Sequence, residues 1–219
     1  MSVAPADQTR GDSTVWFDGD GVVRLSRNEV ATLCMKAGRG AGMAWGLAEE
    51  AGYAVGWLTD RGIDGAEELL AHLDAAQDRG WADLCPRIQG DRWQAPKAGA
   101  ICPIALGAAL CDHAALPEGP APGCILHIGS VNHPVLILAF LADIATTRGA
   151  SLLLEWDGGS VCAGGHYAPL EPATRTLCGR RGLALRLTVR DGLAPPDPPA
   201  GTPALRIHAA TIAALNAFA

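Results

Sequence analysis

The chain has 219 residues, of which 49% are hydrophobic, and a formal net charge of −6 at pH 7; this length suits one domain or two small lobes. No run of lysine and arginine exceeds two residues, and nucleic-acid binding requires a basic face, so we predict no nucleic-acid partner. The first fifteen residues lack a secretory signal, and the apolar run 134–142 is far shorter than the roughly 20 residues of a membrane helix.

The first predicted elements are a tail and a short hairpin. We expect residues 1–13 to be a disordered tail. Strands are predicted at Thr14–Phe17 and Val22–Leu25, around the DGDG turn of residues 18–21. The turn lacks the spaced ligands and the terminal Glu of a calcium loop, so we predict no calcium there.

Three helices are predicted next. Ser26 and Glu29 have the spacing of a capping box, which starts the first helix, and glycines at 38–42 end it. A second helix is predicted at 44–59, where a stripe of Ala and Gly lets a neighbouring backbone approach closely. A third helix is predicted at 66–78 with its leucines facing inward.

The glycines of the first helical corner are Gly40, Gly42 and Gly46. Their spacing is similar to that of a nucleotide-binding loop. A dinucleotide fingerprint needs a strand before its glycines, whereas the capping box places a helix there. We therefore interpret the glycines as a helix–turn–helix corner.

The same corner carries a candidate ligand site. Trp45 and Glu49 lie one helical turn apart, and Arg39 lies in the preceding glycine turn. An arginine and a carboxylate placed in this way can hold a small polar ligand, with Trp45 and Glu50 beside it and Glu49 moving a proton. The alternative is a structural salt bridge that ties the turn to the helix.

The middle of the chain predicts less regular structure. Residues 80–98 are expected to be an irregular loop packed by its own tryptophans. A buried helix is predicted at 101–113, and the Pro- and Gly-rich residues 116–123 form a linker.

A strand–helix–strand unit follows the linker. Strands are predicted at 124–129 and 151–156, with a helix between them that has Asn132 as its cap and Pro134 in its first turn and stops at Gly149. Short connections of this kind are typical of a βαβ unit. Further strands are predicted at 160–163, 183–189 and 205–208, with a second linker at 193–203 and a terminal helix at 211–218.

These elements predict an α/β protein. Its N-terminal helical lobe covers residues 14–116, and a small mixed sheet with a βαβ unit covers residues 124–219; the two lobes could also form one compact domain.

The start of the βαβ helix is the second candidate site. Ser130 and Asn132 lie where a strand ends and a helix begins, and backbone N–H groups at such a point can bind an anion. His133 is the candidate general base. It is also the partner for a nucleophilic Cys162, if the fold brings the two together.

A metal site has weaker support. Imidazole and thiolate groups suit zinc, but the spacing of these residues matches no zinc signature. We therefore predict no metal. We interpret the histidines as polar side chains with hydrogen-bond partners in the protein, and the cysteine as a buried thiol. The weak candidate ligands are His127, His133, Cys162 and His166.

Two resemblances extend this interpretation. The stretch SRNEV…C.KAGRGAGMAWGLAEEAG, within Leu25–Gly52, resembles the N-terminal signature of an uncharacterised bacterial family, domain of unknown function 3726. This resemblance implies a cytoplasmic bacterial protein and no established activity. Residues 26–73 are similar to the N-terminal lobe of the non-Rossmann malate/L-lactate dehydrogenase family. That family continues its RG-x-D with Ser-His-Gly, where the His is catalytic, but residues 61–66 here read RGIDGA.

The sequence therefore predicts a cytoplasmic protein. Its seven cysteines are odd in number and scattered, without a C-x-x-C pair, and without a secretory signal we expect them to be reduced. We expect it to bind or transform a small polar or anionic metabolite between its lobes, without a cofactor that the sequence identifies. The alternative is a non-catalytic subunit of a larger assembly, in which Ala/Gly-faced helices and exposed tryptophans serve protein contacts. Homo-oligomerisation stays open in both cases.

Overall fold

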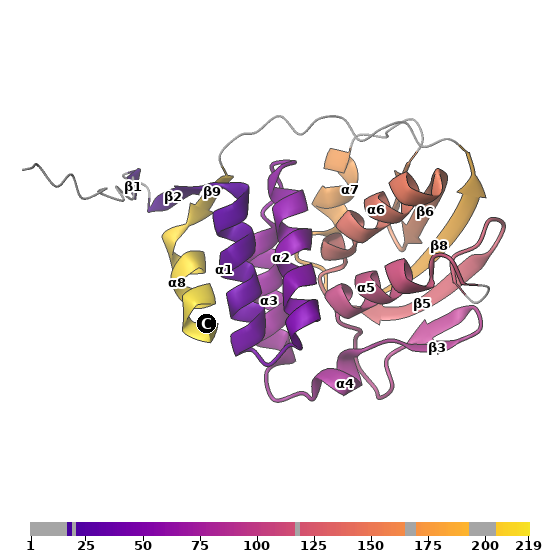
Figure 1. Ribbon diagram of the computed structural model, residues 1–219, viewed down its shortest axis with the longest axis horizontal. Coiled ribbons are helices and arrows are strands. Elements are labelled where there is room, and N and C mark those ends of the chain that lie inside the picture. Colours follow the sequence, from indigo (N-terminus) through magenta and orange to yellow (C-terminus); the bar gives the residue numbers. More distant parts are fainter. Residues whose placement is uncertain (1–16, 19–20, 117–118, 165–169, 193–204) are drawn as a thin grey trace, which may run out of the picture.

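The computed structural model describes residues 17–18, 21–116, 119–164, 170–192 and 205–219 of the chain. A layer of helices from the N-terminal part lies beside a mixed β-sheet with its own helices (Figure 1). This architecture confirms the predicted α/β class. Among the described residues, no helix is long and apolar enough to cross a membrane.

Three helices form the N-terminal layer, namely α1 (Arg27–Gly40), α2 (Trp45–Thr59) and α3 (Gly65–Ala76). The predicted capping box at α1 is confirmed, because the Ser26 hydroxyl accepts from the Glu29 N–H and the Glu29 carboxylate accepts from the Ser26 N–H. Such reciprocal bonds satisfy backbone donors that a helix leaves free at its start.

The stripe of small residues on α2 lets α1 approach closely. A Cβ atom at Gly52 would lie 2.6 Å from the backbone oxygen of Ala31 on α1. The neighbouring Ala48, Ala51 and Val55 are fully buried. The helices therefore pack backbone to backbone along this stripe.

The C-terminal segment returns to the N-terminal helices. Strands β1 (Phe17–Asp18), β2 (Val22–Leu25) and β9 (Leu205–His208) form an antiparallel sheet in that order. Helix α8 (Ala209–Phe218) follows β9 and lies against α1 (Figure 1). The predicted division into lobes at residues 116–124 stays a prediction, and residues 14–16 of the predicted hairpin lie outside the described residues.

The larger sheet has six strands, in the spatial order β3-β4-β5-β8-β6-β7. Their bounds are β3 (Arg87–Gln89), β4 (Arg92–Gln94), β5 (Ile125–Val131), β8 (Leu183–Asp191), β6 (Ala150–Trp156) and β7 (Gly159–Ala163). The β4–β5 pair is parallel and the other neighbours are antiparallel. The sheet is therefore mixed, as predicted.

The predicted βαβ unit is present in a split form. β5 leads through a 3-10 turn, η1 (Pro134–Ile137), and helix α6 (Leu138–Arg148) into β6. Because β5 and β6 both run antiparallel to β8, they are parallel to each other, with β8 inserted between them. Helix α5 (Pro103–His113) lies beside α6, and Trp93 of β4 packs edge-on against His113 of α5.

Three expectations need correction. Residues 80–98, expected to be irregular, contain the short helix α4 (Trp81–Leu84) and the β3–β4 hairpin. These three-residue strands are too short to show a period, and they are held by the distant strand β5. Helix α7 (Leu170–Leu177) was not predicted from the sequence. The helical segment after β5 has His133 as its N-cap, while the side chain of Asn132 accepts from the Gly182 N–H.

Candidate functional site

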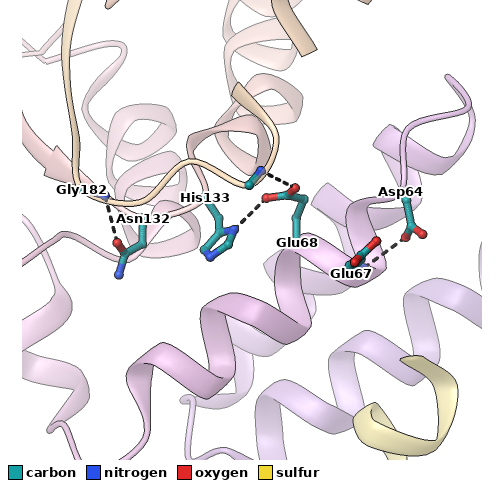
Figure 2. A network of polar contacts seen from close by, with 7 residues as sticks. Asp64, Glu67, Glu68, Asn132, His133 and Gly182 are labelled. Atoms are coloured by element: carbon teal, nitrogen blue, oxygen red, sulfur yellow. Dashed lines mark hydrogen bonds and ion pairs between the residues drawn. The ribbon is translucent and has the colours of Figure 1, made fainter. Parts of the chain in front are cut away.

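A buried carboxylate–imidazole pair joins the helical layer to the sheet. Glu68 lies in the first turn of α3, and His133 lies directly after β5. The Oε2 atom of Glu68 is 2.7 Å from the Nδ1 atom of His133, and both side chains are buried (Figure 2). Asp64 caps α3 by accepting from the Glu67 N–H, which fixes the turn that carries Glu68.

The loop between α7 and β8 wraps this pair. The Gly179 N–H donates to Oε1 of Glu68 at 2.7 Å, and the His133 N–H donates to the Arg180 carbonyl at 2.9 Å. The Gly182 N–H donates to Oδ1 of Asn132 at 3.1 Å (Figure 2). The loop is therefore bonded to Glu68, to His133 and to Asn132, and it carries the exposed Arg180.

The His133 ring is held with one nitrogen free. Its backbone has a φ of 47°, in the left-handed region that non-glycine residues seldom adopt. Nδ1 is bonded to Glu68, whereas Nε2 is buried and has no hydrogen-bond partner among the described residues. Buried polar atoms are nearly always paired, so an unpaired imidazole nitrogen calls for an explanation. A carboxylate on Nδ1 with a free Nε2 is also the arrangement of a histidine that transfers protons.

A second buried pair lies one turn further along α3. Nε2 of His72 is 3.1 Å from the Sγ atom of Cys102, and Nδ1 of His72 is unpaired within the described residues. Burial lowers the pKa of His72 to about 3, with the nearby charge of His133 as a smaller cause. Burial likewise raises the pKa of Cys102 to about 12. Both groups are therefore neutral near pH 7, and Cys102 is not a thiolate nucleophile.

His72 makes the protein sensitive to acid. Its pKa is about 3 in the folded protein against 6.5 when unperturbed, so between these values the unfolded chain binds a proton that the folded protein does not. The free energy of unfolding is expected to fall as the pH drops from 6.5 towards 3, with a contribution of up to about 1.4 kcal/mol per pH unit.

Urea unfolding at several pH values checks this expectation. The His72→Leu variant should show a shallower loss of stability on acidification, whereas the exposed control His208→Leu should keep the wild-type slope. If the free energy of unfolding fell equally steeply with pH in the wild type and in both variants, His72 would not contribute to the acid sensitivity.

The predicted cluster at the first helical corner is present on the surface. The guanidinium of Arg39 lies 5.5 Å from the centre of the Trp45 ring, and the Trp45 indole N–H donates to Glu49 at 2.8 Å. Arg39 also donates to the Met43 carbonyl. Trp45 is 60% exposed, so the cluster lies at the surface and not in a buried pocket. A hollow of about 240 Å³ beside it is lined in part by Glu49.

Glu50 does not join this cluster. Burial raises its pKa, and the carboxylates of Asp112 on α5 and Asp143 on α6 add to the effect. Glu50 is therefore close enough to the carboxylates of α5 and α6, as well as to that of the adjacent Glu49, to feel their charge.

The two predicted halves of the site are separate. Trp45 is the first residue of α2, whereas Glu68 follows the far end of that helix. A helix of 15 residues is about 22 Å long. The structure thus brings Ser130, Asn132 and His133 together at the end of β5, and Arg39, Trp45 and Glu49 together at the opposite end of α2.

The weak metal candidates are also dispersed. His127 lies on β5 and Cys162 on β7, with β8 and β6 between them, which corresponds to about 14 Å. The Cys162 thiol donates to the Gly164 carbonyl, and burial raises its pKa, which does not favour a nucleophile. His166 lies outside the described residues. The described residues contain no group of three His, Cys, Asp or Glu that could hold a metal ion.

Glu68 and His72 were not predicted as site residues from the sequence. Both lie on the same face of α3 as the buried Leu69 and Leu73, four residues apart from each other. A carboxylate and an imidazole on the apolar side of a helix are the signal that could have identified them, because charged groups are seldom buried unless paired.

Comparison with known proteins gives a family without an activity. Residues 25–102 match the family described as Protein of unknown function (DUF3726), which confirms the resemblance found in the sequence. The chain is also similar to a crystal structure of malate dehydrogenase from Entamoeba histolytica, with 10% identity and a TM-score of 0.48. That alignment covers 62% of this chain and 39% of the enzyme chain, in line with the weaker likeness, and carries no argument about activity. No curated protein matches the chain.

Proposed function

We propose that the protein binds or transforms a small polar or anionic metabolite at the junction of α3, the end of β5 and the loop of residues 178–182. His133 is the group that exchanges a proton with this metabolite, and Glu68 orients it. We also infer a cytoplasmic location, which the seven free cysteines support because thiols persist in a reducing compartment.

The observation that carries the proposal is the unpaired Nε2 atom of His133. A carboxylate at Nδ1 fixes the orientation of the ring and leaves Nε2 as the nitrogen that can exchange a proton. Because Nε2 is shielded from solvent, the partner for its proton is a bound molecule and not bulk water. Asn132 and Ser130 lie at the same strand end, and the loop that covers the pair supplies Arg180 and Arg181 for an anionic group.

A thermal-shift screen tests this proposal. Small carboxylates, phosphates and neutral polar compounds are added to the wild-type protein, and a ligand at 100 times its dissociation constant should raise Tm by about 5 °C or more. His133→Asn is the informative variant, because asparagine tolerates the left-handed backbone but lacks the imidazole.

The expected result is a shift that His133→Asn abolishes and Trp45→Ala retains. A screen without any hit, or hits of equal size in wild type and His133→Asn, would contradict the proposed site. If Trp45→Ala alone lost the shift, the ligand would bind at the helical corner instead.

The second candidate function is that of a non-catalytic subunit, and the exposure of Trp45 favours it. Tryptophan is enriched at the centres of protein interfaces and is 60% exposed here. Under this alternative, Trp45→Ala changes the free energy of unfolding by less than about 1 kcal/mol and weakens association. Sedimentation velocity of the wild type and of Trp45→Ala tests this alternative. If the wild-type protein is a monomer at all concentrations, Trp45 does not mediate self-association.

A further inference from the structure

Among the described residues, no helix packs on one face of the six-stranded sheet. Along β8, the leucines Leu183, Leu185 and Leu187 are buried, whereas Ala184, Arg186 and Arg190 are exposed. α5 and α6 cover the buried side, and the alternate residues point away from them. We call this side the open face. Its charged side chains are Arg87, Arg92, Glu155, Arg186 and Arg190, and it also carries the titratable His127 and Cys162.

The strand register aligns the basic groups of the open face. Arg92 pairs with His127 across β4 and β5, and His127 pairs with Arg186 across β5 and β8. Neighbouring strands are about 4.8 Å apart, so Arg92 and Arg186 lie about 10 Å from each other on either side of His127. Glu155 continues the row on β6.

The open face carries a net positive charge, whereas the whole chain carries a net negative charge. Four arginines stand against one glutamate, although the chain as a whole carries a net charge of −6. None of the four arginines forms an ion pair within the part of the chain that the structure describes. Arg92 and Arg186 are separated by one strand, so an anionic partner lying across His127 could interact with both guanidinium groups.

The surroundings of the row fit an acidic protein segment better than a nucleic acid. Binding of single strands depends on aromatic side chains that stack with bases, but Trp93 and Trp156 are buried on the opposite side of the sheet. No aromatic side chain of the described strands points to the open face. Two hollows can accept side chains. One, of about 540 Å³, is lined by His127 and Ile125 together with Asp91, and the other, of about 290 Å³, is lined by Arg186 together with Glu155 and Trp156.

We propose that the open face docks a Glu- or Asp-rich segment of a partner protein, whose carboxylates bind Arg92 and Arg186. This inference is independent of the metabolite site at Glu68 and His133. It depends on the local positive charge of the open face, which contrasts with the net charge of −6 of the whole chain.

Fluorescence anisotropy with a labelled poly-L-glutamate peptide tests the docking surface. The wild-type protein is expected to bind the peptide, with an affinity that falls as salt is added. Arg186→Glu should weaken binding about tenfold, and Arg92→Glu with Arg186→Glu should abolish it. Lys36→Glu makes the same change of charge at an exposed position on α1 and should leave the affinity as in the wild type.

Three results would overturn the proposal. The first is an absence of peptide binding by the wild-type protein at low salt. The second is an equal loss of affinity in Arg186→Glu and Lys36→Glu, which would indicate a general charge effect. The third is displacement of the peptide by oligothymidylate at lower concentration than by unlabelled poly-L-glutamate, which would make the surface a nucleic-acid site. Circular dichroism of each variant confirms that the fold is retained.

Discussion

Replacing Glu68 with leucine is expected to lower the free energy of unfolding by about 3–5 kcal/mol. The carboxylate of Glu68 accepts from the Gly179 N–H and is bonded to Nδ1 of His133, and it is buried between α3 and the sheet. Leucine has a similar volume but leaves both partners without an acceptor. Urea unfolding monitored by tryptophan fluorescence measures the difference.

The adjacent Glu67 provides the matched control. It lies on the same turn of α3 but is exposed, so Glu67→Leu should change the free energy of unfolding by less than about 1 kcal/mol. Equal effects of the two substitutions would mean that the buried pair does not hold α3 to the sheet. If Glu68→Leu yielded no soluble protein while Glu67→Leu did, the result would agree with the larger loss of stability expected for Glu68→Leu.

The second large effect is expected where α2 packs against α1, because α2 contains two glycines with opposite surroundings. Gly52→Ala places a Cβ atom 2.6 Å from the Ala31 carbonyl oxygen, which belongs to the backbone of α1 and cannot move aside as a side chain would. We expect a loss of about 1–3 kcal/mol as the two helices are forced apart.

Gly46→Ala, in the same helix, is expected to stabilise the protein by up to about 1 kcal/mol. No atom lies within 4 Å of the added Cβ, and alanine has the higher helix propensity. Thermal unfolding of both variants measures the contrast. A gain in Tm from both substitutions would show that α1 and α2 do not pack through Gly52.

The Glu68–His133 pair links stability to the proposed function. α3 belongs to the N-terminal helical layer and His133 to the connection after β5, so one pair of side chains joins the two parts of the structure. A ligand at Nε2 of His133 would therefore bind at the contact between them. This position agrees with the general tendency of small-molecule sites to occur where two structural units meet.

Local sequence signals determined most of the helices and strands. Ser26 with Glu29 set the start of α1, Gly149 set the end of α6, and Leu205–His208 was predicted as the strand that the structure contains. These signals work because a cap, a left-handed glycine and a period of two act between residues close in the chain. The Arg39, Trp45 and Glu49 cluster could be predicted for the same reason, since all three lie within eleven positions of one corner.

Tertiary structure alone decided the rest. The insertion of β8 between β5 and β6, and the pairing of β4 with β5, depend on contacts between segments far apart in the chain. Likewise, His133 was predicted as a candidate base, but its partner Glu68 lies 65 residues earlier, and no local pattern encodes that distance. The hydrogen bond and the burial that single out this histidine exist after the helical layer and the sheet have packed together, because desolvation is a property of the assembled core.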